Sequence, residues 1–180
     1  MVSSGLSFAH TARSGTYFRV ADPDWEDPLD GLAGAAVGGR WNSPGSFPVV
    51  YLNESVNLAR LFVAYRLRRQ PYGPEDLDPE TAPSLAHADM PEASYVDIVT
   101  DDGCQRAGLP VTYPFDQRGK VVTHAACWPI GDRAWLQSEP GIACRSATTG
   151  AAASDEELAW FQRASQLTLS NLQPFSEWFF

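Results

Sequence analysis

The most informative stretch of the sequence combines glycine, arginine and aromatic residues over a short span. Residues 38–45 read GGRWNSPG, and Tyr51 follows in a β-branched run. A glycine such as Gly39 lets the backbone approach a ligand closely. Arg40 can form charge-assisted hydrogen bonds with an anionic group, and Trp41 and Tyr51 can stack on a flat ring. This pattern indicates a site for an anionic, ring-bearing ligand, and the alternative is a glycine-rich turn with a structural arginine and core aromatics.

Two strands and a helix are expected around this stretch. Residues 16–20 (TYFRV) and 47–52 (FPVVYL) are aromatic and β-branched, as is typical of strands. Four apolar residues then recur at helical spacing: Leu58, Leu61, Phe62 and Tyr65. They predict an amphipathic helix of about four turns, with Asn53 as a plausible N-cap and Pro71 after its end. Phe62 falls on the apolar stripe, which indicates a core residue.

The remaining chain mixes strands and helices without regular βαβ spacing. Residues 22–39 are predicted to form a long loop, and the proline- and acid-rich residues 71–93 a surface excursion. The shorter elements expected are a strand over 95–100, a helical turn over 101–107, a short helix over 128–137, a strand over 141–145, a helix or strand entry over 155–161, and one or two strands within 167–180. This pattern favours an α+β fold over a doubly wound sheet.

Length and charge narrow the classes of protein to consider. With 180 residues, the chain is expected to form a single domain over 16–180, preceded by a flexible arm of small and polar residues over 1–15. The net charge is -9, which makes electrostatic binding to nucleic acid or to an anionic membrane unfavourable. No apolar run approaches the ~20 residues of a membrane span, so no membrane association is expected.

The cysteines and histidines give no sign of a metal site. Three isolated cysteines, at positions 104, 127 and 144, include no C-x-x-C pair, and the three histidines show no metal-ligand spacing. Isolated cysteines fit a reducing compartment, and the N-terminus lacks the continuous apolar core of a signal peptide. The sequence therefore predicts a soluble, cytoplasmic protein without a metal.

The block GGRWNSPG, followed after three residues by VVYLNES, resembles the signature of the RES domain family, the toxin half of RES–Xre toxin–antitoxin modules. The resemblance begins upstream with YFRV and continues downstream through IGDRAW and GIACRS, in the family's order. It covers roughly residues 16–165. The first block is specific, whereas the later blocks are weak when taken alone.

The resemblance implies a mixed β core similar to ADP-ribosyltransferase toxins, flanked by helices. Family members consume NAD by hydrolysis or phosphorolysis, or transfer ADP-ribose, so NAD is implied as a substrate and no cofactor is expected. The leading function is a RES-type toxin that cleaves the nicotinamide–ribose bond of NAD. The alternatives are an ADP-ribosyltransferase acting on a macromolecule and a diverged RES fold that binds a nucleotide or a protein partner with little catalysis. An Xre-type antitoxin protein is an expected partner, and a homo-oligomer is left open.

Seven residues are the resulting site candidates. The catalytic candidates are Arg19, Tyr51 and Ser146, and the substrate-binding candidates are Gly39, Arg40, Trp41 and Glu54. Structural roles stay open for them: buried ion pairs for the arginines, core packing for the aromatic residues, and a turn-capping hydroxyl for Ser146.

The sequence departs from the family at the glutamate for which the family is partly named. In the family pattern this residue lies eleven positions after the tyrosine, and that position here is Phe62. Cleavage of the nicotinamide–ribose bond builds positive charge on the ribose, which a carboxylate stabilises. Glu54 lies about 12 Å from Phe62 along a helix axis, too far for a simple exchange. Either another acid substitutes, for example one from residues 75–102, or the pocket binds without efficient turnover.

Overall fold

The computed structural model describes residues 7–163 and 167–180. The elements in chain order are β1 (His10–Ala21), α1 (Leu32–Val37), β2 (Val49–Asn53), α2 (Val56–Leu67), the 3₁₀ helix η1 (Pro74–Asp76), β3 (Ser84–Ile98), α3 (Asp101–Ala107), α4 (His124–Leu136), β4 (Gly141–Arg145), β5 (Glu156–Phe161), β6 (Thr168–Gln173) and α5 (Phe175–Trp178).

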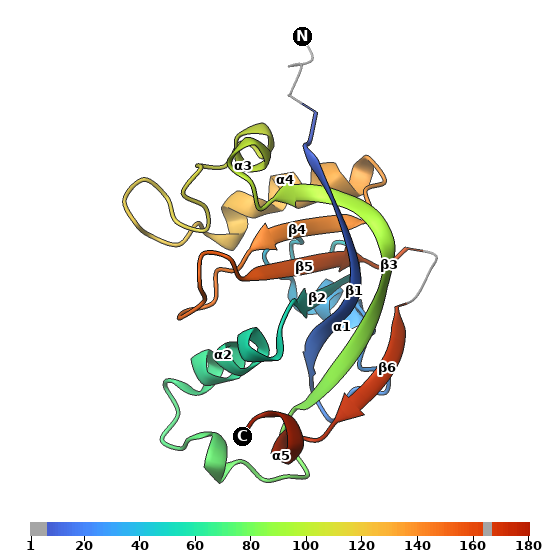
Figure 1. The fold of residues 1–180 in the computed structure, drawn as a ribbon, viewed down its shortest axis with the longest axis vertical. Coiled ribbons are helices and arrows are strands. Elements are labelled where there is room, and N and C mark those ends of the chain that lie inside the picture. The colour runs from blue at the N-terminus through green and yellow to red at the C-terminus, as the bar shows by residue number, and fades with distance from the viewer. Residues whose placement is uncertain (1–6, 164–166) are drawn as a thin grey trace.

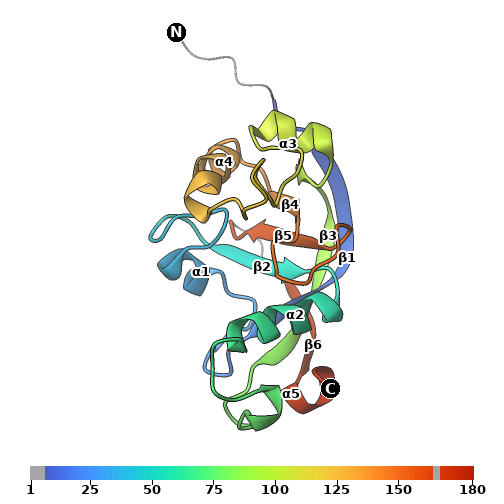
Figure 2. The same cartoon turned by 90° about the vertical axis from the view of Figure 1, so that its left-hand side faces the viewer.

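The strands form a six-stranded mixed sheet in the order β1-β2-β5-β4-β3-β6. β3 and β4 run parallel, and the other neighbouring pairs are antiparallel. β1 also pairs with β3, so the first five strands of this order close into a ring. Helices α3 and α4 lie at one end of the strongly curved sheet, and α2 and α5 lie at the other (Figures 1 and 2). The chain is thus one α+β domain, as its sequence predicts.

Three clusters of buried apolar side chains hold these elements together. The first lies between the outer face of β2, β5 and β4 and the helices α3 and α4. The second takes side chains from all five ring strands and fills the interior of the ring. The third joins β1 and β3 to α2 and α5. Because successive strand residues point to opposite faces, the neighbours Leu158 and Ala159 belong to different clusters.

The pairing of β1 with β3 is longer than the sequence indicates. β1 begins at His10, which pairs with Val96, so residues 10–15 of the expected arm belong to a strand. β3 begins at Ser84, so much of the expected surface excursion is also a strand. The register shifts between Arg13 and Gly15, near Pro91 on the partner strand. Pro91 has no N–H for a regular ladder, and the irregularity accommodates it. Residues 1–6 of the expected arm lie outside the described residues.

Several helix boundaries also differ from expectation. Ser55, and not Asn53, is the N-cap of α2, because its side chain accepts a hydrogen bond from the Leu58 N–H at 3.1 Å. The expected loop over 22–39 contains the short helix α1. Helix α4 starts four residues before the expected position, at a cap provided by Thr123. The C-terminal segment ends in the helix α5 after the strand β6.

The apolar stripe predicted for α2 is wrong at Phe62 and at Tyr65, which are both exposed. The buried residues of this helix are Leu58, Ala59 and Val63, whereas Phe62 is 37% exposed. Its ring centroid lies 5.8 Å from the guanidinium carbon of Arg66. Phe62 is therefore a surface residue and not part of the core. In the part of the chain that the structure describes, no helix is long and apolar enough to cross a membrane.

Candidate functional site

Tyr51 is held in a fixed orientation by the loop that precedes β2. Its hydroxyl donates to Asn42 Oδ1 at 2.6 Å and accepts from the Trp41 N–H at 2.9 Å. Burial raises the pKa of Tyr51 well above its ordinary value, so the hydroxyl stays protonated at neutral pH. A Cβ atom on Gly39 would lie 2.4 Å from the tyrosine hydroxyl oxygen. The glycine is thus required sterically by the tyrosine ring.

Arg40 lies on the same side of the sheet, beneath the start of α4. Its Nη1 donates to the Val122 carbonyl at 2.8 Å, and its guanidinium lies beside Cys127. Burial, together with the charge of Arg40, lowers the pKa of His124. None of the ion pairs within residues 7–163 and 167–180 involves Arg40. This half-buried guanidinium is therefore left without a counterion.

Ser146 lies directly after β4 and contacts a carboxylate that the sequence did not single out. Its hydroxyl donates to Glu157 Oε1 in a short hydrogen bond. Thr148 donates from Oγ1 to the same oxygen at 3.1 Å, and its N–H donates to the Ser146 hydroxyl at 3.1 Å. Glu157 pairs in register with Asn53 on one side and with Cys144 on the other. Alternation along β2 then places its side chain on the same sheet face as that of Tyr51.

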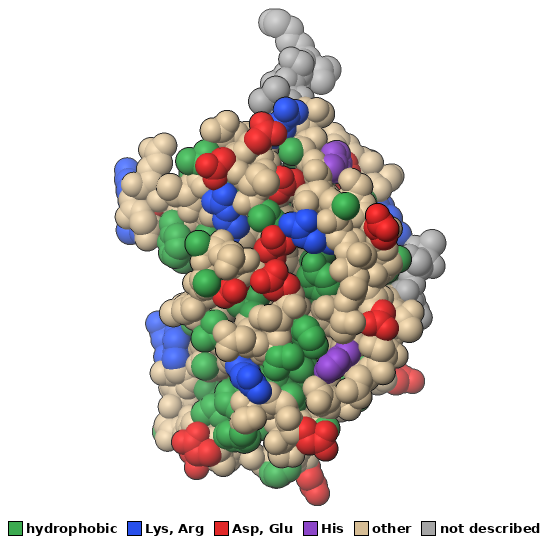
Figure 3. Space-filling view, in the orientation of Figure 1, with side chains coloured by type: hydrophobic (Ala, Val, Ile, Leu, Met, Phe, Trp, Pro, Cys, Tyr) green, Lys and Arg blue, Asp and Glu red, His purple; other side chains and the backbone are tan. Residues whose placement is uncertain are grey.

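A cavity of about 600 Å³ opens beside Ser146 and Thr148. Two loops form most of its wall, one over residues 112–115 and the other over residues 146–153, with Val99, Val121 and Arg145 completing it. The two loops lie next to each other on the left of Figure 1, and the face drawn in Figure 3 is indented at its left edge above α2. This volume falls within the usual range of small-molecule sites.

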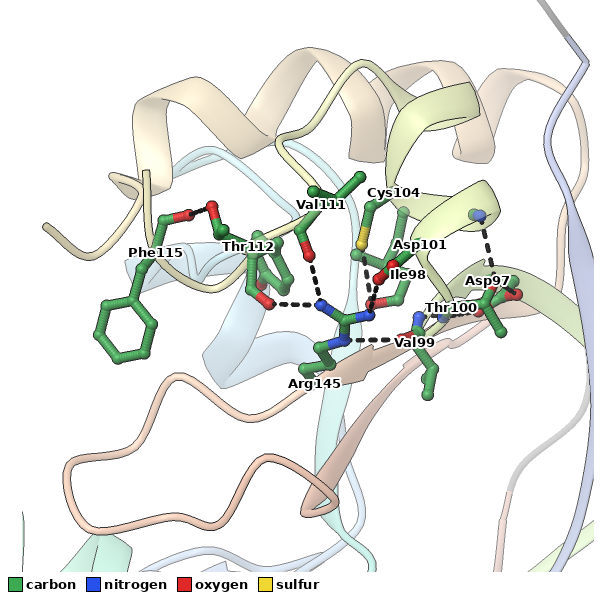
Figure 4. A network of polar contacts seen from close by, with 12 residues as sticks. Asp97, Ile98, Val99, Thr100, Asp101, Cys104, Val111, Thr112, Phe115 and Arg145 are labelled. Carbon is green, nitrogen blue, oxygen red and sulfur yellow. Dashed lines mark hydrogen bonds and ion pairs between the residues drawn. The ribbon is translucent and has the colours of Figure 1, made fainter. Parts of the chain in front are cut away.

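Arg145 fastens the first of these loops to the sheet (Figure 4). Its guanidinium donates to the carbonyls of Val111 and Tyr113 at 2.7 and 3.1 Å. It also donates to the Val99 carbonyl at 2.6 Å and pairs with Asp101 at 2.7 Å. Because these partners come from the residue after β3, from α3 and from the loop, one side chain sets the position of the cavity wall.

We expect Arg145→Ala to lower the free energy of unfolding by roughly 3 kcal/mol, because it leaves three carbonyls and one carboxylate without their charged donor. Chemical denaturation measures this loss. Arg106→Ala is the matched control: it removes a surface pair with Asp102, in which both side chains are well exposed, and a loss below about 1 kcal/mol is expected. Equal losses in the two variants would contradict the positioning role of Arg145.

Arg19 lies on a different face of the sheet from Tyr51. Phe18 pairs with Asn53 across β1 and β2, so the next residue, Arg19, points to the interior of the ring. Its Nη1 donates to the carbonyls of Pro28 and Asp30 at 3.1 and 2.8 Å. Its guanidinium also lies 4.5 Å from the centre of the Trp25 ring. Burial lowers the pKa of Arg19 to about 10. In this arrangement Arg19 closes the loop after β1, away from Arg40 and Ser146.

Of the seven candidates from the sequence, only Ser146 is among the described residues that line the cavity. Glu54 and Trp41 lie apart from it. Glu54 follows β2 and donates its N–H to the Glu156 carbonyl at 3.2 Å. Burial and the neighbouring Glu156 carboxylate raise the pKa of Glu54. Trp41 is only 1% exposed and packs in the first apolar cluster, so it supports the loop from beneath. Among the described residues, no group of three or more acidic, histidine or cysteine side chains is placed to hold a metal ion.

Two residues of this region were missed in the sequence. Glu157 belongs to an acidic run, DEE over residues 155–157, at the start of the segment expected to be a helix or strand entry. Arg145 belongs to a short strand segment whose other residues are apolar or small. The available signal was that Glu157 directly precedes the apolar Leu158, since neighbouring residues of a strand point to opposite faces of the sheet. It becomes useful only when the pairing of β5 with β2 and β4 is known.

Comparison with known proteins agrees with this fold. The family model of the RES domain matches residues 16–171. The chain therefore belongs to the RES domain family, which confirms the resemblance seen in the sequence. A chain in the crystal structure of the M. tuberculosis MbcT–MbcA toxin–antitoxin complex is similar, with a TM-score of 0.72 and 22% sequence identity. The likeness covers 94% of this chain and 91% of that chain, and at this identity it shows the fold alone. No curated protein matches the sequence.

Proposed function

We propose that this RES domain is the toxin of a toxin–antitoxin pair and consumes NAD by cleaving the bond between nicotinamide and ribose. Membership of the RES domain family supports the class of protein. The solved relative is part of a toxin–antitoxin complex, which supports a protein antitoxin as the partner. A bound antitoxin is expected to stop NAD consumption.

The observation that carries the NAD proposal is the uncompensated charge of Arg40 close to the cavity. No carboxylate of the described residues pairs with Arg40, so its guanidinium can bind a ligand that supplies the negative charge. Arg40 is bonded to Val122, and Val121 lines the cavity. The pyrophosphate of NAD would provide the missing anion through charge-assisted hydrogen bonds. Ser146, at the cavity wall, would hydrogen-bond a ribose hydroxyl.

The proposed reaction breaks one covalent bond and forms another. When the nicotinamide–ribose bond breaks, its electron pair leaves with the nicotinamide nitrogen, and the ribose becomes positively charged. Water or inorganic phosphate then forms the new bond to the ribose carbon and releases a proton. The acceptor decides between hydrolysis and phosphorolysis, and the products, ADP-ribose and its 1-phosphate, distinguish the two reactions.

We expect the purified protein to release nicotinamide from NAD, and Arg40→Ala to bind NAD about 10- to 150-fold more weakly. This range corresponds to the loss of about 1.5–3 kcal/mol for a hydrogen bond to a charged group. Chromatography of the products, with and without phosphate, measures turnover, and calorimetry measures the dissociation constant. Arg69→Ala removes an exposed arginine at the end of α2 and is expected to leave both quantities unchanged.

Two results would overturn this proposal. The first is the absence of NAD binding at millimolar concentration in the wild-type protein. The second is NAD binding that Arg40→Ala leaves intact, because the proposal assigns the pyrophosphate to this side chain.

A further inference from the structure

The residue at the family's glutamate position cannot supply a carboxylate here. Phe62 is a partly exposed surface residue of α2 and does not line the cavity. The helix itself, VNLARLFVAYRL, contains no aspartate or glutamate. If NAD is cleaved, the carboxylate that stabilises the charged ribose must therefore come from another element.

Glu157 is positioned to replace it. Two hydroxyls, those of Ser146 and Thr148, donate to Oε1 of Glu157. Ser146 and Thr148 line the cavity, whereas Glu157 is not among the lining residues and reaches the cavity wall through these two side chains. The second oxygen, Oε2, accepts no hydrogen bond from the described residues, and it is not fully buried. The carboxylate is thus oriented through one oxygen, while the other keeps its hydrogen-bonding capacity.

The other acids around Glu157 contact different groups. Glu156 points to the opposite side of β5, where Arg13 donates to its two oxygens at 2.9 and 3.0 Å. Asp155 accepts from the Ala152 N–H at 2.7 Å and closes the loop. Glu54 lies beside Glu156. None of these side chains contacts Ser146 or Thr148 through a hydrogen bond.

The acids of residues 75–102, considered from the sequence as substitutes, make no hydrogen bond with Ser146 or Thr148, in contrast to Glu157. Asp97 accepts from the N–H groups of Val99 and Thr100 and from the Thr100 hydroxyl. Burial acts to raise its pKa, but these hydrogen bonds outweigh it and lower the pKa. Asp101 is paired with Arg145. Both acids therefore serve the structure of the turn before α3.

We propose that Glu157 has taken over the role of the family's glutamate, as the carboxylate that stabilises positive charge on the ribose. This inference rests on the proposed NAD-cleaving function. As the bond to nicotinamide breaks, the negative charge of Glu157 faces the developing positive charge, and no atom of the carboxylate is consumed. The hydroxyls of Ser146 and Thr148 hold the carboxylate in place, which makes both of them positioning residues.

The test compares Glu157→Gln with Glu156→Gln, which alters the preceding acid on the opposite side of the same strand. We expect Glu157→Gln to lower the rate of nicotinamide release by about 10²–10³-fold, a typical loss for one preorganised electrostatic group. The dissociation constant for NAD should stay within about threefold, because the carboxylate acts mainly when the positive charge moves from the nicotinamide ring to the ribose in the transition state. Glu156→Gln should retain turnover within about threefold of the wild type.

The outcomes separate this inference from the function on which it rests. Wild-type protein that releases no nicotinamide overturns both. Wild-type release that Glu157→Gln preserves overturns the role of Glu157 alone. If thermal melting shows that Glu157→Gln is unfolded, Glu157→Asp takes its place, since it keeps the charge and withdraws the carboxylate by one methylene. It should lower turnover about tenfold or more at an unchanged NAD dissociation constant, and unchanged turnover would overturn the assignment.

Discussion

Gly131→Ala is expected to lower the free energy of unfolding by about 3 kcal/mol or more, because the added methyl group has no space. A Cβ atom at this position in α4 would lie 1.6 Å from the carbonyl oxygen of Trp41 and 2.6 Å from its carbonyl carbon. These atoms belong to the backbone, so no side-chain rotation relieves the clash. Trp41 is itself 1% exposed in the core. Either α4 or the loop that carries Arg40 must therefore move.

Denaturation with urea measures this loss, and Asp132→Ala provides the control. Asp132 is the next residue of the same helix and is exposed, so its replacement by alanine should change stability by less than about 0.5 kcal/mol. Similar stability of Gly131→Ala and the wild type would show that α4 does not pack on the Trp41 backbone as described. The same contact explains why a glycine precedes the aspartate in the segment IGDRAW.

Gly39→Ala is expected to reduce the rate of nicotinamide release by about 100-fold, the scale of effect that a displacement of about 1 Å produces in an active site. The new Cβ atom would lie 2.4–2.5 Å from the hydroxyl oxygen and two ring carbons of Tyr51. The ring must shift, which breaks its hydrogen bonds with Asn42 and Trp41. Product chromatography on the purified variant measures the rate.

Two further variants define what the Gly39 result means. Ser46→Ala alters an exposed residue of the same loop and should leave the rate within about twofold of the wild type. Tyr51→Phe keeps the ring but removes the hydroxyl, and so reports the contribution of the two hydrogen bonds alone. A folded Gly39→Ala variant with wild-type turnover would show that the position of Tyr51 does not control the rate of nicotinamide release.

The candidate site was predictable from the sequence only where its residues share one short segment. The block over 38–45 contains Gly39, Arg40 and Trp41, and all three gather around Tyr51 or directly beneath it. In contrast, the resemblance grouped Arg19 with them, whereas β1 directs Arg19 to the interior of the ring. Which way a strand residue points depends on the register of its pairing, and one sequence does not contain this information.

Glu157 is the converse case: the sequence did not group it with the site, and the strand pairing places it there. Its hydrogen bond with Ser146 joins residues eleven positions apart across the loop between β4 and β5. In the sequence, the family resemblance singles out Ser146, whereas Glu157 is only one acid at the start of a segment expected to be a helix or a strand. The antiparallel pairing of Cys144 with Glu157 brings Ser146 and Glu157 together. The pairing of Glu157 with Asn53 of β2 places the carboxylate on the side of the sheet that carries Tyr51.

The sequence by itself determined the family, the α+β class and the elements whose signals are local. Helix α3 is an example, because its cap Thr100 and the left-handed Gly108 after its end both lie within a few residues of it. Only the tertiary structure decided the extent of β1 and β3, the placement of Arg19, and the meeting of Ser146 with Glu157. The physical reason is the range of the interactions. A cap is satisfied within one helical turn, whereas the pairing of His10 with Val96 depends on the whole sheet.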